Sequence, residues 1–446
     1  MTTSGNGALA SGALANGPLA NGPLASGALA KKVKRLGRLD IEGGGQVVVQ
    51  GDHAFIGHMD PPHGTTIVDV SNPAQPRIVS RITLPDMHSH SHKVRVAGDL
   101  MIVNSEQFNR HHLRKGEEIP AVTRRLEQEL GRAPSDEDIA GALGVSPAEL
   151  PELREAGARG YRDGGFKIYN ISDLTNPRLL CFQKTHGVGV HRFDCDERYA
   201  YISPEKEGFH GNILAVYDLS NPEKPAEVGN WWMPGQHLAG GDTPHWNGYR
   251  NRLHHTLRLN DKIFAACWHA GFSVIDASDL TNLKTLASHN YHPPVRDPTH
   301  TILPVPHKIG GRELALVIDE EHEHVQGQPH AFMWLFDVGD LENIHPLSSF
   351  YVSETDSPWT RSGGRFGAHQ FQEHMTGNLV YVTWFSGGLR IVDISDPLLP
   401  REVGSFIPEP GKGHSVPQSN DVDVDGRGLI YLLDRLNGLD ILEMEG

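Results

Sequence analysis

The chain of 446 residues carries 40 Lys and Arg against 55 Asp and Glu, so its formal net charge is −15. This length excludes a peptide or a single small domain, and the acidic balance argues against a general surface for nucleic acids or anionic membranes. Three scattered cysteines, Cys181, Cys195 and Cys267, exclude a disulfide framework and indicate free thiols in a reducing compartment. Because long uncharged apolar runs and a secretory signal pattern are both lacking, the sequence predicts a soluble cytoplasmic protein without a membrane span.

The first segment, residues 1–34, is predicted to be a disordered low-complexity leader. Residues 2–30 cycle through near-copies of one pentapeptide, such as Ala-Asn-Gly-Pro-Leu, and such a segment has no periodic apolar face to bury. A docking tail for a protein partner is the alternative, because leucine recurs along the segment.

The remainder, residues 35–446, repeats one pattern of short strands and turns. Abundant glycine and proline, 49 and 30 residues, set aside an all-helical fold. The clearest copy is GLRIVDISDPLLPREVGSF at 388–406, and the turn position of the seven copies is occupied by Asp69, Asn170, Asp218, Asp276, Asp337, Asp393 and Glu443. Each unit is consistent with four strands, which predicts an all-β, seven-bladed β-propeller. Because the last copy ends after its third strand, residues 35–42 are expected to supply the fourth strand and close the ring.

The copy LRIVDISDP at 389–397 resembles the LVIVD repeat that names a family of bacterial propeller proteins. The resemblance covers about residues 36–446, apart from one insertion. It implies a propeller fold and assigns no activity, since a fold does not determine a function.

The insertion occupies residues 107–163, between the second and third strands of blade two. Ser135 with Asp138, and Ser146 with Glu149, have the spacing of capping boxes, and Gly144 can end the helix between them. The segment therefore predicts a helical hairpin within the propeller.

Residues 124–150 of this hairpin resemble the third region of bacterial sigma factors, which are helical and contact promoter DNA and polymerase. The segment is short, lies inside a blade loop and carries more acidic than basic residues. We therefore expect a lid, an oligomer contact or a protein-binding element, and no nucleic-acid partner.

Histidines recur at the start of the innermost strand of successive blades. The five aligned positions in blades two to six are His92, His191, His255, His300 and His369. Asn420 and Gly45 take the corresponding places in blades seven and one. Because inner strands line the channel of a propeller, these side chains are expected to converge at one height.

Converging neutral imidazoles predict a transition-metal site, with iron favoured and copper or zinc as alternatives. A metal would also offset the cost of burying several polar rings together. The competing interpretation is architectural, because each ring could instead hydrogen-bond the backbone of a neighbouring blade.

Further residues on the same face are candidates for catalysis and substrate binding. Glu320 and Glu205 are expected as general bases or as groups that orient the ligand histidines. A rim that could hold an apolar or anionic substrate is predicted from Trp232, His237, His245, Trp246 and Arg365.

Together these residues predict a metal-dependent oxidase or oxygenase that acts on a small organic substrate. By analogy, the arrangement is similar to carotenoid-cleaving oxygenases, in which four histidines from separate blades hold iron, and to selenium-binding-type thiol oxidases. The alternatives are a metal-assisted lyase or hydrolase, and a non-catalytic protein-interaction scaffold.

Overall fold

The computed structural model describes residues 27–445, except 245, 247–250 and 326. It contains seven four-stranded antiparallel blades whose inner strands contact one another in a closed circle, which confirms the predicted propeller. Among the described residues, no helix combines the length and the apolar character needed to cross a membrane.

In blades one to six the four strands run from the channel outward in chain order. Blades one to four are β3 (Gly44–Gln50), β4 (His53–His58), β5 (His63–Asp69), β6 (Arg77–Thr83); β8 (Val94–Ala97), β9 (Leu100–Gln107), β10 (Gly165–Asn170), β11 (Arg178–Lys184); β12 (His186–Cys195), β13 (Tyr199–Glu205), β14 (Leu214–Asp218), β15 (Ala226–Trp231); and β16 (Asn251–Leu259), β17 (Lys262–Trp268), β18 (Phe272–Asp276), β19 (Lys284–His289). Blades five to seven are β20 (Thr299–Pro304), β21 (Leu314–Asp319), β22 (Met333–Asp337), β23 (His345–Phe350); β24 (Ala368–Phe371), β25 (Leu379–Trp384), β26 (Gly388–Asp393), β27 (Arg401–Ile407); and β28 (Ser419–Val424), β29 (Ile430–Asp434), β30 (Asn437–Met444), with β2 (Val33–Glu42) as the outermost strand of blade seven.

The repeated turn residue has one structural role in six of the blades. Its side-chain oxygen accepts a hydrogen bond from the backbone N–H two residues later, as Asp69 does from Ser71 and Asp393 does from Ser395. The same bond occurs at Asn170, Asp218, Asp276 and Asp337. This side-chain turn ends the third strand and directs the chain into the fourth. The sequence repeat therefore specifies the turn between the third and fourth strands, which form the outer half of each blade.

The ring closes with a strand from the beginning of the chain, as predicted. β2 pairs antiparallel with β30, and Arg35 and Arg38 form ion pairs with the buried carboxylate of Asp440. Ordered structure starts earlier than the predicted leader boundary at residue 34, because β1 (Leu29–Lys31) pairs with β27 at the outer edge of blade six. Residues 1–26, the rest of the predicted leader, lie outside the described residues.

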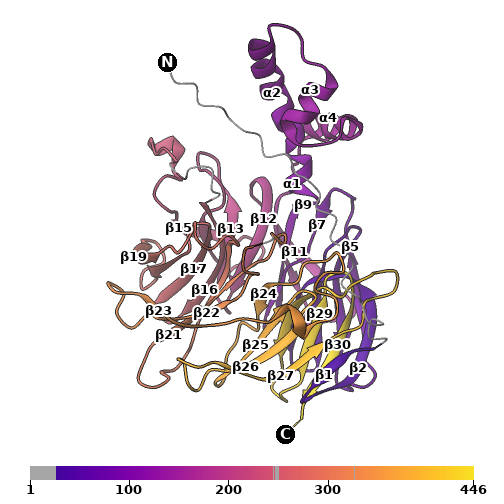
Figure 1. Cartoon of the computed structure of the whole chain (residues 1–446), viewed down its shortest axis with the longest axis vertical. Helices are drawn as coiled ribbons and strands as arrows, with labels where there is room; N and C mark the ends of the chain where they lie inside the picture. Colours follow the sequence, from indigo (N-terminus) through magenta and orange to yellow (C-terminus); the bar gives the residue numbers. More distant parts are fainter. Residues whose placement is uncertain (1–26, 245, 247–250, 326, 446) are drawn as a thin grey trace.

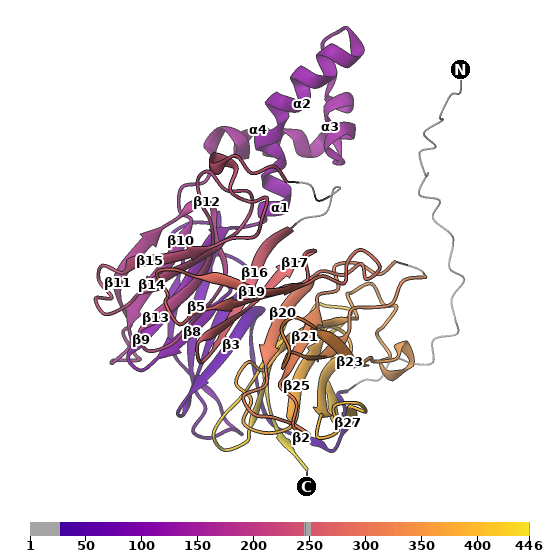
Figure 2. The same cartoon turned by 90° about the vertical axis from the view of Figure 1, so that its left-hand side faces the viewer.

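The insertion is a small helical unit that projects from one face of the propeller (Figures 1 and 2). It comprises α1 (Arg110–Leu113), α2 (Lys115–Leu130), α3 (Asp136–Leu143), a 3₁₀ turn at Pro147–Glu149 and α4 (Leu150–Arg159). Both predicted capping boxes form, and Gly144 ends α3 in the left-handed conformation. Buried Ile139, Leu150 and Leu153 belong to an apolar cluster made only of insertion residues.

Substitution Ser135→Ala is expected to destabilise α3 by about 1 kcal/mol, because the Ser135 side chain accepts the N–H of Asp138. Hydrogen exchange of the amides in 136–143 should then accelerate about fivefold, while exchange in the blades stays unchanged. Ser220→Ala, a change in a blade-three turn, is the control. Unaltered exchange in α3 would show that the capping box contributes nothing to the stability of the insertion.

Candidate metal centre

A β-bulge lies near the start of six of the seven inner strands. The pairing with the second strand shifts between Gly44 and Gln46, Val190 and Arg192, Asn251 and His255, Thr299 and Thr301, Ala368 and Gln370, and Ser419 and Asp421. A bulged residue leaves the ladder and its side chain can be re-aimed. The residues left out of the ladder include His191, His254, His300 and His369.

Six imidazoles form a continuous arc around the channel. Successive ring centroids are separated by 4.3 Å (His90 to His92), 5.0 Å (His92 to His191), 5.1 Å (His191 to His254), 4.3 Å (His254 to His300) and 4.5 Å (His300 to His369). Four of the five predicted histidines belong to this arc, and sequence reasoning did not place His90 or His254 in it.

The fifth predicted ligand, His255, lies outside the arc. It pairs with Ala266 in the regular ladder, and its Nδ1 lies 3.4 Å from Thr301 Oγ1 and 3.7 Å from Glu373 Oε1. Because side chains alternate along a strand, adjacent His254 and His255 cannot occupy the same layer. The predicted alignment of blade four was therefore wrong by one residue, and His254 takes the place assigned to His255.

Three histidines of the arc present the same nitrogen to one point. The Nδ1–H of His254 donates to the carbonyl of His300 at 2.7 Å, and that of His369 donates to the carbonyl of Asn420 at 2.5 Å. His300 Nδ1 lies 3.1 Å from Gln370 Oε1. With the proton held on Nδ1 by an acceptor, each ring carries its lone pair on Nε2, the arrangement found in metal-ligating histidines. The predicted bonding to neighbouring backbone thus occurs at Nδ1 and leaves Nε2 available.

Glu320, which directly follows β21, faces these Nε2 atoms. Its carboxylate lies 3.9 Å from His300 Nε2 and 3.8 Å from His369 Nε2, too far for hydrogen bonds. Ligand atoms of His254, His300 and Glu320 all lie within 4.8 Å of one another. Donor atoms that share one ion at about 2.1 Å are separated by roughly 3–4 Å, so only small shifts would bring these groups around a cation.

The ionisation of this group also suits a cation. Burial lowers the pKa of His254, His300 and His369 well below the usual imidazole value, so their rings are neutral. Burial alone would raise the pKa of Glu320, but its interactions with His322 outweigh burial and hold that pKa well below its usual range. The Nε2 of His254 is buried without a hydrogen-bond partner, which is costly unless a ligand satisfies it.

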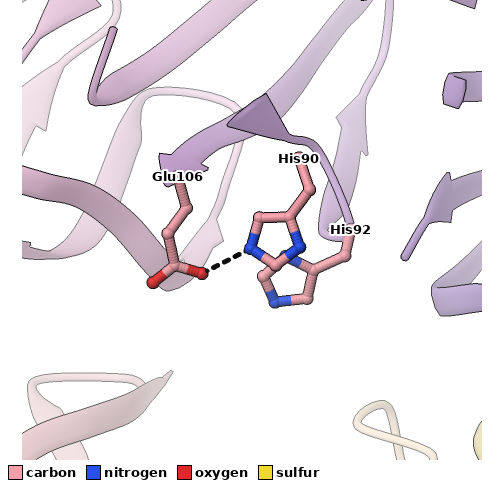
Figure 3. Close-up of side chains that lie close together, drawn as sticks. All are labelled: His90, His92 and Glu106. Carbon is pink, nitrogen blue, oxygen red and sulfur yellow. Dashed lines mark hydrogen bonds and ion pairs between the residues drawn. The ribbon is translucent and has the colours of Figure 1, made fainter. Parts of the chain in front are cut away.

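A second group, His90, His92 and Glu106, is compact but less suited to a metal (Figure 3). His90 stacks on His92 with 26° between the ring planes, so their lone pairs run side by side instead of converging. Glu106 is already engaged by His90 and His191, each at 2.9 Å, and by Arg110. This group is therefore satisfied by its own contacts.

The hydrogen bonding of His92 also argues against a ligand role. Asn104 accepts from the backbone N–H of Lys93 and donates to the carbonyl of Val190, which fixes the orientation of its amide. The same amide donates to His92 Nδ1 at 3.2 Å, so the ring proton lies on Nε2. His92 therefore offers a donor to the channel and no lone pair.

A third group, His324, His330 and Glu354, lies outside the arc. The two nitrogens of His330 face carboxylates, Glu321 at 2.5 Å and Glu354 at 3.1 Å. Burial alone would lower the pKa of His330, but these carboxylates outweigh it and raise it. The protonated ring links two carboxylates and has no lone pair left for a metal.

The predicted rim residues divide into two places. Arg365 donates to Glu320 at 2.9 Å and lies over the ring of Phe385, so it belongs to the group around Glu320. Trp232 and His237 pack around Phe209, and Trp246 contacts His210, in the loop that precedes blade four. His245 lies outside the described residues.

Glu205 is separate from the Glu320 group. Its carboxylate pairs with Arg114 of the insertion at 2.7 Å and accepts the N–H of Val188 at 3.1 Å. It lines a cavity of about 620 Å³ between the insertion and blade three, together with Phe209 and His210. Glu205 therefore holds the insertion in place, beside the aromatic part of the predicted rim.

The base of the insertion covers the mouth of the channel. Arg110 of α1 reaches His191 at 2.7 Å and pairs with Glu106. A larger cavity, about 1290 Å³, lies between His111 and Lys115 of the insertion and Trp268 and His322 of blades four and five. The helices thus adjoin the arc directly.

Comparisons with known proteins agree with this architecture. The LVIVD repeat model matches residues 44–83, 195–232 and 374–407, and the Sigma-70 region 3 model matches residues 114–161. No curated protein matches the sequence.

The C-terminal WD40 domain of Sif2 is similar in fold, with a TM-score of 0.51 at 9% identity over 93% of this chain and 99% of that one. The computationally designed Ika8 protein matches with a TM-score of 0.47 at 8% identity over 91% of this chain and 98% of that one. The chain is therefore a β-propeller in which three segments match the LVIVD repeat, and its second blade carries a segment similar to sigma-70 region 3.

Proposed function

We propose that the protein is a metal-dependent enzyme whose transition-metal ion is held in the propeller channel by His254, His300, His369 and Glu320. The observation that carries this proposal is the common hydrogen bonding of the three rings, with Nδ1 fixed by protein acceptors and Nε2 directed toward one carboxylate. Structural zinc prefers closed sites of four ligands. The cavities above this centre favour a site that admits a substrate.

A set of ligands made of three imidazoles and one carboxylate suits iron, copper or zinc, and we favour iron. A bound iron or copper ion would supply one-electron chemistry with dioxygen. The protein would orient the ligands through their Nδ1 bonds, keep Glu320 ionised, and admit a small organic substrate below the insertion. We accordingly propose an oxidase or oxygenase.

The sharpest test compares two adjacent histidines. Protein purified without an affinity tag is expected to contain about one transition-metal ion per chain by elemental analysis, because ligand atoms of His254, His300 and Glu320 lie within 4.8 Å of one another and His369 Nε2 lies 3.8 Å from Glu320. His254→Ala should lower that content to roughly a tenth, and His255→Ala should leave it unchanged. Equal loss of metal in the two variants, or full metal content in both, would contradict the proposed ligand set.

Oxygen dependence separates the proposed reaction classes. An oxidase or oxygenase should turn over only with dioxygen, whereas a metal-assisted lyase or hydrolase should work equally well without it. Three free cysteines, Cys181, Cys195 and Cys267, support our further proposal of a reducing, cytoplasmic location.

A scaffold function is the alternative favoured by one observation. The insertion has its own apolar core and projects away from the blades (Figure 2), which suits a protein-binding element. Metal-free protein that folds, retains the insertion and binds no ion at micromolar concentration would favour this alternative.

A further inference from the structure

A cavity of about 360 Å³ adjoins the metal centre on the side of blades one, two and seven. Its lining includes Glu320 together with His92, Lys93 and Arg435. Cavities of this size accept small organic molecules, and those in proteins typically combine an apolar wall with a few placed polar groups. Met59 and Phe108 supply apolar surface here.

Two neighbouring residues of blade two supply donors to this cavity. His92 carries its ring proton on Nε2, since Asn104 donates to Nδ1. Buried Lys93 donates from Nζ to the carbonyl of Gly45 at 2.9 Å and makes no ion pair with a carboxylate among the described residues. Its remaining N–H groups lack a charged partner.

Arg435 is a third donor, from the turn between β29 and β30. One Nη donates to Asn420 Oδ1 at 3.0 Å, and no carboxylate in the described part of the chain forms an ion pair with this guanidinium. Asp60 and Glu320 are the acidic residues that line the same cavity. Glu320 is paired with Arg365, and Arg110, the other cation of the lining, is paired with Glu106.

This distribution of charge indicates which ligand fits. Burial lowers the pKa of Lys93 well below its usual value, so Lys93 serves here as a hydrogen-bond donor, and Arg435 is the cation of the lining that no ion pair engages. A monoanion would pair with Arg435, whereas a phosphate dianion would meet Asp60 and Glu320 with excess negative charge. A guanidinium also matches a planar carboxylate through two parallel hydrogen bonds.

We propose that this cavity binds the carboxylate of a small organic monoanion through Arg435, Lys93 and His92. The remainder of the molecule would extend toward Glu320 and the histidine arc. That the anion is the substrate rests on the proposed metal-dependent function. The carboxylate site itself is independent of the metal.

The test is a calorimetric titration of benzoate into EDTA-treated protein and into metal-loaded protein. Benzoate should bind once per chain, and its neutral analogue benzamide at least about 10-fold more weakly, because only the carboxylate pairs with the Arg435 guanidinium. Inorganic phosphate should bind more weakly than benzoate. Tighter binding of phosphate, or equal binding of benzamide, would overturn the proposal on the unaltered protein.

Variants identify the residue involved. Arg435→Gln should weaken benzoate binding at least about 10-fold, with partial recovery in Arg435→Lys. Arg427→Gln is the matched control, since Arg427 lies in the same blade and pairs with Asp425 away from this cavity. Unchanged benzoate affinity in folded Arg435→Gln would overturn the proposal. Arg435-dependent binding, in a protein that contains no metal as purified and takes up none when iron, copper or zinc is added, would support the anion site and reject the metal-dependent function.

Discussion

Substitution Glu320→Gln is expected to weaken transition-metal binding by roughly 100-fold or more, the largest loss from a single change in the proposed centre. Glu320 is the only carboxylate within reach of His300 and His369 Nε2 among the described residues. Without it, three neutral rings would hold a buried cation that has no anionic ligand. Competition with a chelator of known affinity measures the effect.

Thermal unfolding supplies a second measurement of the same change. Free metal at 100 times its dissociation constant should stabilise the unaltered protein by about 2.7 kcal/mol, and the Glu320→Gln variant by far less. Glu205→Gln makes the same chemical exchange at a carboxylate that pairs with Arg114, and it should keep normal metal affinity. Full affinity in Glu320→Gln would remove this residue from the ligand set.

Removal of β2 is expected to lower the unfolding temperature by at least about 10 °C or to make the protein insoluble. A chain that starts at residue 44 loses the buried side chains of Val33 and Ile41, each worth roughly 1.5–3 kcal/mol. It also leaves the carboxylate of Asp440 without Arg35 and Arg38, and such a broken pair costs about 3–5 kcal/mol.

Calorimetry or circular dichroism on heating would measure this loss. A chain that starts at Gly27 keeps β1 and β2 and is the matched control. A synthetic peptide of residues 29–43 added to the shortened chain should restore part of its stability, because it can pair with the free edge of β30. An unfolding temperature within about 2 °C of the control would show that blade seven is stable with three strands.

The blade repeat was predictable because its signal is local. Asp69 and its equivalents accept hydrogen bonds two residues along the chain, and the capping boxes at Ser135 and Ser146 act over three residues. Such short-range chemistry leaves its pattern in the sequence. The closing role of residues 35–42 followed from the missing fourth strand of the last copy.

The candidate site was only partly predictable, because it depends on bulges and on contacts between blades. Phe193 in blade three and Ile302 in blade five occupy one equivalent position of the inner strand, and in blade four that position is taken by the polar Thr256. An alignment based on the alternation of apolar residues therefore selected His255 in place of His254. The proton position on each ring depends on partners such as Asn104 and Asn420 in the folded structure. Spacing along the chain carries no information about these partners.

The pairing of β2 with β30 has a consequence for synthesis of the protein. Residues 33–42 are made long before their partner, residues 437–444. The first blades can form during translation, but the circle stays open until residues 437–444 have emerged from the ribosome. Premature termination would therefore yield an unclosed ring with exposed sheet edges, which is a ready target for quality control by chaperones and proteases.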